Sequence, residues 1–105
     1  MRRVVITGLG IVSCIGNNQS EVLDSLLNTK SGIVFSEDHK KYNFRSQVVG
    51  SIKNLNLSDH IDRKQMRFMG DGSAYNFIAM KEAIKDSGLD EKKISNEMTG
   101  IIMGS

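Results

Sequence analysis

The sequence has few of the residues that cross-link a fold. It has one cysteine, Cys14, so no disulfide can form within the chain, and nothing indicates an oxidising compartment. Two histidines and one cysteine are too few for a structural zinc site at the usual ligand count. Proline is absent, and there is no internal repeat or low-complexity tract. The expected location is the cytoplasm.

Long apolar runs and a large net charge are also lacking. No apolar stretch reaches the ~18 residues that a membrane-spanning helix needs. A net charge of +2 is too small to indicate a nucleic-acid partner by itself. The apolar content of 39% and the charged content of 25% are those of a soluble globular protein. The 105 residues make one domain or a piece of one.

The amino-terminal segment is the most informative part of the sequence. An apolar, β-branched run over Val4–Thr7 leads into Gly8 and Gly10, and a second apolar run ends at Gly16. Such a run predicts a strand buried on both faces, as in sheets covered by helices. A basic start before apolar residues also fits an export signal. However, glycine and threonine dilute this run, and no small-x-small cleavage site follows.

Paired glycines after a strand also occur in dinucleotide-binding proteins. That fingerprint needs a third glycine at position 13, which is Ser13 here. It also needs an acidic residue about 20 positions later, and residues 30–36 contain none. A nucleotide-binding α/β module therefore remains a distant alternative.

The next segments predict a helix, a loop and a short strand. Asn18 and Glu21 are spaced as a capping box, and apolar residues at helical spacing follow them. This helix is expected to stop near Lys30 and Gly32. Residues 33–44, which are mixed and charged, predict a loop with little regular structure. The segment after them, 47–52, predicts a short or edge strand.

The remaining segments predict two helices and a strand. Ser58 and Asp59 are expected to cap a short helix. A longer amphipathic helix is predicted over Asp71–Ser87, with Gly88 as its C′ residue. Its apolar side is expected to pack, and its charged side, with Lys81, Glu82, Lys85 and Asp86, to be solvated. Gly100–Met103 predicts a final core strand.

Several short motifs follow one another along the chain: Val4-Val5-Ile6-Thr7-Gly8-Leu9-Gly10, Gly16-Asn17-Asn18, Ser31-Gly32-Ile33, Ile61-Asp62-Arg63-Lys64, Arg67-Phe68-Met69 and Ser87-Gly88-Leu89. In this order they resemble the amino-terminal end of the β-ketoacyl-acyl-carrier-protein synthases, in particular the type I elongating condensing enzymes. The resemblance implies an α/β, thiolase-like fold of two similar halves, each with a mixed sheet between helices, paired into a homodimer. Residues 1–105 would then be a partial amino-terminal half, truncated after a core strand.

The resemblance also implies a reaction. In this family a cysteine takes an acyl group from a carrier protein or coenzyme A. Malonyl carrier protein is then decarboxylated, and its carbanion attacks the acyl thioester. Two histidines stabilise the developing enolate oxygen, and no metal or organic cofactor is required. The reactive residues are expected beyond Ser105. A non-catalytic ketosynthase-like partner subunit, which has lost the nucleophile, stays open as an alternative.

No residue of this chain is expected to be catalytic. Cys14 lies outside the family's nucleophile motif, with no basic residue nearby in sequence, and is interpreted as a small buried filler. His39 lies in a charged segment and is expected to be solvated. His60 precedes a predicted helix and matches no catalytic histidine of the family.

One binding site is predicted within the chain. Arg63, Lys64 and Arg67 are spaced to share one side of a short helix. Taken alone, they would be a solvated basic face. In the family, basic residues at the matching positions contact the acidic acyl carrier protein, so the resemblance implies a docking site here. Asp62 would either orient Arg63 or cap the helix.

Overall fold

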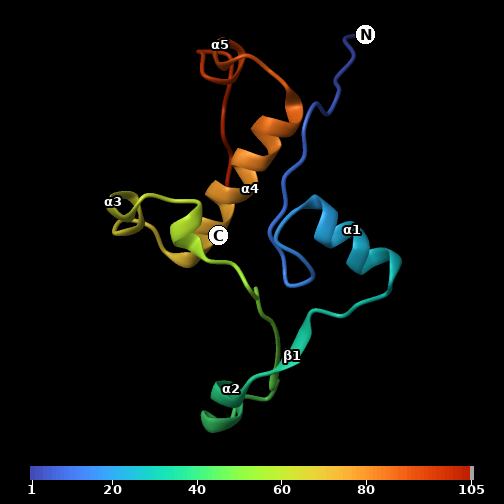
Figure 1. Ribbon diagram of the computed structural model, residues 1–105, viewed down its shortest axis with the longest axis vertical. Helices are drawn as coiled ribbons and strands as arrows, with labels where there is room; N and C mark the ends of the chain where they lie inside the picture. Colours follow the sequence, from blue (N-terminus) through green and yellow to red (C-terminus); the bar gives the residue numbers. More distant parts are fainter. Residues whose placement is uncertain (105) are drawn as a thin grey trace.

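A computed structural model describes residues 1–104 (Figure 1). Its elements in chain order are α1 (Gln19–Leu27), β1 (Ile33–Phe35), α2 (Glu37–Lys41), β2 (Val48–Gly50), the 3₁₀-helix η1 (Leu57–Asp59), α3 (Arg63–Met66), α4 (Asp71–Ser87) and α5 (Glu91–Ile94). The Cα radius of gyration is 16.9 Å, against about 13 Å for a compact domain of 100 residues. The chain is therefore an open assembly of helices and strands.

Helix α1 begins as its sequence predicts. The Asn18 side chain accepts a hydrogen bond from the Glu21 backbone N–H at 3.0 Å. The Glu21 carboxylate in turn accepts from the backbone N–H of Asn17 at 2.8 Å, one residue earlier than in a standard capping box. The first interaction satisfies an amide group that the start of a helix leaves free, and the second holds the residue before the cap.

The end of α1 differs from the prediction. The helix stops at Leu27, and the left-handed residue that follows is Thr29, with φ of 51°. The Lys30 N–H donates to the Ser25 carbonyl at 2.8 Å, which is the long bond of a Schellman motif. The stop expected near Lys30 and Gly32 lies too far along the chain. The left-handed position that ends the helix is occupied by Thr29, a β-branched residue, where glycine is usual. The Lys30 ammonium also hydrogen-bonds the Asp24 carboxylate and lowers its pKa.

Residues 33–50 form an arm that projects from the body, and the loop predicted over 33–44 is wrong (Figure 1). Strands β1 and β2 pair antiparallel, with Val34 opposite Val49. The tip of the arm is α2, where the Ser36 side chain accepts from the backbone N–H of His39 at 3.3 Å. The short strand predicted over 47–52 is confirmed as β2. The charged residues over 37–41 favoured a loop in the prediction, but they form a short helix that the Ser36 cap supports.

The predicted strands at the two ends of the chain are wrong for this structure. Within residues 1–104, Val4–Thr7 and the segment 100–103 are extended but unpaired. Val4 is 95% exposed and Ile102 is 99% exposed. A strand exists only through hydrogen bonds to neighbouring strands, and the described residues place none beside these segments.

The segment before α3 also differs in its capping. Ser58 and Asp59 belong to η1, and their side chains are bonded to Asn56, at 2.8 and 3.1 Å. They therefore close a local turn and do not cap α3. Asp62 holds the N-cap position of α3 but makes no side-chain cap hydrogen bond.

Helix α4 has the predicted bounds, and Gly88 ends it in the left-handed conformation, with φ of 61°. Its buried residues Ala74 and Ile78 pack with Ile61 into a small core. Partly buried apolar residues surround that core, namely Val12, Leu55, Leu57, Met66, Met69 and Phe77. This core holds the segment before α3 against α4.

The amino-terminal segment runs along α4 at backbone contact distance. A Cβ at Gly10 would overlap the Ala79 carbonyl oxygen and lie 2.7 Å from the Ala83 nitrogen, and a Cβ at Gly8 would lie 2.7 Å from the Ser87 nitrogen. The glycines therefore serve close packing against a helix. They do not cradle a phosphate, which removes the basis for the nucleotide-binding alternative.

Two carboxylates of α4 hold the same segment. The Asp86 carboxylate accepts from the Leu9 N–H at 3.0 Å, and the Glu82 carboxylate accepts from the Ile11 N–H at 2.9 Å. The prediction that the whole charged side of α4 is solvated is wrong for Glu82, which is partly buried. Hydrogen bonds to a charged acceptor are among the stronger ones, so these acids are structural.

Replacing Gly10 with alanine is expected to destabilise the protein that carries this chain by ~1–3 kcal/mol, the usual cost of an overpacked contact. Gly72→Ala is the matched control, because a Cβ at Gly72 would meet nothing within 4 Å. Thermal unfolding of both variants checks the prediction. Equal melting temperatures for the two would contradict the close approach at Gly10.

The chain produced alone is expected to aggregate, or to melt without a sharp transition. Its described residues bury few apolar side chains, whereas many large ones in the amino-terminal segment, in α1 and in the segment 101–103 are exposed. Exposed apolar segments with unpaired backbone groups promote association. Light scattering and a thermal melt provide the measurement. A monodisperse monomer with a steep two-state melt would contradict the expectation.

Candidate functional site

Helix α3 presents a basic surface because its other side is anchored in the core. Ile61, just before the helix, is 3% exposed, and Met66 packs against the same core. Arg63, Lys64 and Arg67 are exposed. Arg67 lies at the C-cap of the helix, with its backbone N–H on the Gln65 carbonyl.

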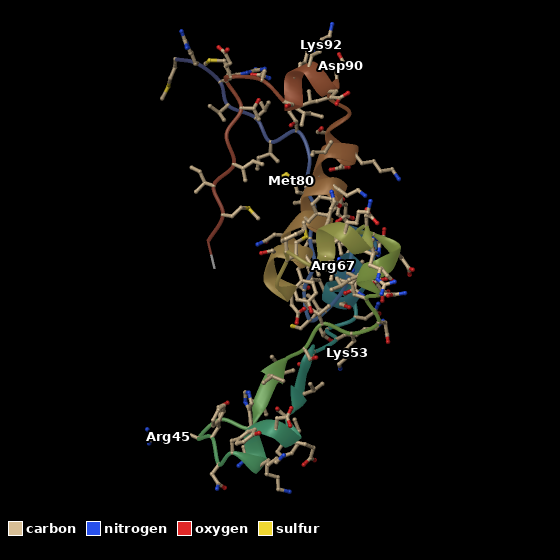
Figure 2. All side chains as sticks on the ribbon, turned by 90° about the vertical axis from the view of Figure 1, so that its left-hand side faces the viewer. Arg45, Lys53, Arg67, Met80, Asp90 and Lys92 are labelled. Atoms are coloured by element: carbon tan, nitrogen blue, oxygen red, sulfur yellow. The ribbon has the colours of Figure 1, made fainter. Side chains whose placement is uncertain are left out.

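Arg63, Lys64 and Arg67 are called the α3 cluster from here on. Within residues 1–104 none of them forms an ion pair, and Asp62 does not bond to Arg63. Figure 2 shows Arg67 in the body of the molecule, whereas Arg45 lies far away at the tip of the arm. The basic groups of the arm and the α3 cluster are therefore separate surfaces.

An open cleft adjoins the segment that leads into α3. It has a volume of about 550 Å³ and lies between the start of α1, residues 54–60 and α4. Lys81 and Lys85 line it from α4, and the Lys81 ammonium donates to the backbone carbonyl of His60 at 3.3 Å. His60 is exposed, and its backbone N–H bonds the Leu57 carbonyl at 3.1 Å.

The carboxylates of this cleft already have hydrogen-bond donors. Glu82 accepts from the Ile11 N–H and from the Gln19 N–H, the latter at 3.0 Å. Glu21 accepts from the Asn17 N–H at 2.8 Å. Asp59 accepts from the Asn56 side chain at 3.1 Å. The sequence did not connect Lys81 and Lys85 with a cleft, since nothing local shows that the acids beside them bond to another part of the chain.

Cys14 lies in a tight turn, where the Ser13 N–H donates to the Gly16 carbonyl at 2.8 Å. It is partly buried, and a Cβ at Gly32 or Gly50 would lie 2.7 or 3.1 Å from its sulfur. The thiol therefore fills the space beside two glycines. Its inertness stays a prediction.

His39 differs from its expected state. It belongs to α2, is partly buried, and its ring lies 4.9 Å from the ring of Phe44. Its Nδ1 is 3.2 Å from the Ser46 carbonyl oxygen. It packs within the arm, so the expectation of a solvated loop histidine is wrong.

Two further features concern residues 1–104 as a whole. No helix there is both long and apolar enough to cross a membrane. Over the same residues, no group of three or more His, Cys, Asp or Glu side chains is placed to hold a metal ion.

With this geometry in place, the sequence defines the class of protein. The chain belongs to the β-ketoacyl synthase family, because the family model for the "Beta-ketoacyl synthase, N-terminal domain" matches residues 1–105. The chain is similar to 3-oxoacyl-[acyl-carrier-protein] synthase 1 of Haemophilus influenzae, at 55% identity over 105 residues, and of Escherichia coli K12, at 53% over 106 residues. It is 36% identical to synthase 2 of Staphylococcus aureus over 106 residues.

The coverage of these alignments is unequal. The alignments with the two synthase 1 proteins cover all of this chain, and the alignment with synthase 2 covers 99% of it. They include 26% of each synthase 1 and 25% of synthase 2. The chain therefore spans about a quarter of the length of the curated relatives it matches.

Cys14 is expected to react slowly with a thiol probe in the protein that carries this chain, and quickly after denaturation. The reason is its packing against Gly32 and Gly50, which limits access to the sulfur. Mass spectrometry of the labelled Cys14 peptide over time gives the measurement. Equal labelling rates in the native and denatured protein would show that the thiol is freely accessible.

Proposed function

We propose that this chain is the amino-terminal part of a β-ketoacyl-acyl-carrier-protein synthase of the synthase 1 type, an acyltransferase of fatty acid chain elongation. The observation that supports this most is identity along the whole chain, which is higher to the synthase 1 relatives than to the synthase 2 relative. The family model, which matches every residue, supports the same assignment.

The proposed reaction is a decarboxylative condensation. A cysteine thiolate attacks the acyl thioester and releases the carrier thiol. Malonyl carrier protein then loses carbon dioxide, and its carbanion attacks the acyl-enzyme carbonyl and expels the cysteine thiolate. Two histidines stabilise the enolate oxygen. These reactive groups belong to the rest of the protein, and this chain contributes packing and a docking surface.

The proposed setting is a thiolase-like fold, of which residues 1–105 are a partial amino-terminal half, and a homodimer of the complete protein. The two extended apolar segments, 4–7 and 101–103, become strands of its larger sheet. Their exposure here is what unpaired core strands would show. The backbone of Gly8 and Gly10 fixes the amino-terminal strand against α4.

The proposed role of the α3 cluster is to dock the acidic acyl carrier protein. Three observations support this role: the residues are exposed, they form no ion pair within residues 1–104, and the core holds their helix in place. Fixed charges of one sign raise the rate at which an oppositely charged partner finds its site.

Reversing the α3 cluster, as Arg63→Glu, Lys64→Glu and Arg67→Glu together, is expected to raise the KM for carrier-bound donors in the complete protein. Exposed ion pairs are worth only ~0.2–1 kcal/mol each, so single neutral substitutions should change little. Turnover of a small acyl donor without the carrier should be nearly unchanged. Steady-state kinetics with both donors provides the measurement.

Two controls sharpen this test. The effect on carrier-bound donors should shrink at high salt, because the Debye length falls to ~3 Å at 1 M. A second variant, Lys92→Glu with Lys93→Glu, reverses exposed lysines of α5 and should leave both donors unaffected. Equal loss with both donors in the α3 variant would make the helix structural. No loss with either would leave it a solvated face.

A further inference from the structure

We propose that the docking surface continues beyond α3, across the His60 backbone, to Lys81 and Lys85 on α4. These two lysines form a second contact for the same acidic carrier protein. The inference rests on the proposed function, and it adds residues that no spacing in the sequence connects to the α3 cluster.

A hydrogen bond links α4 to the segment before α3. The Lys81 ammonium donates to the His60 carbonyl at 3.3 Å, and His60 stands three residues before Arg63. This segment is fixed, because Ile61 is buried against Ala74 and Ile78 of α4. Lys81 is therefore held beside the segment that carries the α3 cluster.

Helix α4 has acids next to its lysines, which on an isolated helix could form ion pairs with them. Here Glu82 and Asp86 receive backbone N–H groups of the amino-terminal segment, and Glu82 also receives the N–H of Gln19. Within residues 1–104, neither Lys81 nor Lys85 forms an ion pair. Both acids keep their negative charge, but backbone amides hold their oxygens, and the two ammonium groups stay outside any ion pair and open to an external partner.

Lys81 and Lys85 are four residues apart, so they rise about 6 Å along the helix and lie on the same side. Both are exposed, and they line the cleft of about 550 Å³ that opens beside His60. Carboxylates one turn apart on an acidic partner helix would match this spacing. A partner lying across α3 and the rim of this cleft would meet cations from both helices.

The test uses the complete protein and its carrier protein. The double reversal Lys81→Glu with Lys85→Glu is compared with Lys92→Glu with Lys93→Glu, which changes charge by the same amount on exposed residues of α5. Binding of fluorescently labelled holo-carrier is followed by anisotropy at two salt concentrations, alongside KM for carrier-bound and carrier-free donors. The expected result is carrier binding weakened about two- to thirtyfold, as for two exposed ion pairs, with no change for the carrier-free donor.

A further variant serves as a control for loss of folding. Lys81 bonds His60 and lies over the Phe77 ring, so its reversal could disturb the core, whereas Lys85→Glu alone spares both contacts. Lys85→Glu should keep the melting temperature and still weaken carrier binding. The inference is overturned if the α4 reversal and Lys85→Glu bind the carrier as well as the α5 control does. It is also overturned if both donors lose activity equally.

The α3 reversal separates the two proposals. If it weakens carrier binding while the α4 reversal does not, the carrier docks on α3 alone and only this inference fails. If neither reversal affects the carrier, the proposed docking function fails with it. If both do, the combined variant should bind more weakly than either one, because the contacts are to the same partner.

Discussion

The structure depends on the close approach of the amino-terminal backbone to α4. Gly8 and Gly10 allow that approach because any side chain there would overlap the helix. Once the two backbones touch, the amides of Leu9 and Ile11 reach Asp86 and Glu82. Glu82 also receives the first amide of α1, so one side chain joins three segments. The position of α1, the opening of the cleft and the freedom of the α4 lysines all follow from this contact.

The elements that the sequence predicted correctly are those whose signals are local. The bounds of α4 and the Gly88 cap depend on residues within a few positions of one another, as does the Asn18 cap of α1. The prediction of strands at the two ends of the chain was wrong because a strand is defined by its hydrogen-bonded partners, which no local pattern supplies. The prediction of a loop over 33–44 was wrong for the opposite reason. The composition of this stretch is typical of a loop, but a single serine cap and two short paired strands give it regular structure.

The residues of the candidate site also differ in how far the sequence could indicate them. Arg63, Lys64 and Arg67 could be proposed from the sequence because helical spacing and the family resemblance both point to them. Lys81 and Lys85 could not, because their freedom depends on what Glu82 and Asp86 bond to, far away in the sequence. A charged helix face therefore cannot be assigned to solvent from its own residues alone. The family match, in contrast, was available in full from short ordered motifs.

The reach of the Glu82 carboxylate has a consequence for synthesis on the ribosome. Its bond to the Ile11 amide spans 71 positions, and its bond to Gln19 spans 63. Contacts of such separation form late, because a long loop must close before they contribute. At roughly 5–20 residues per second of translation, the first segment emerges several seconds before its acceptor exists. During that interval its apolar residues lack the helix that later holds them.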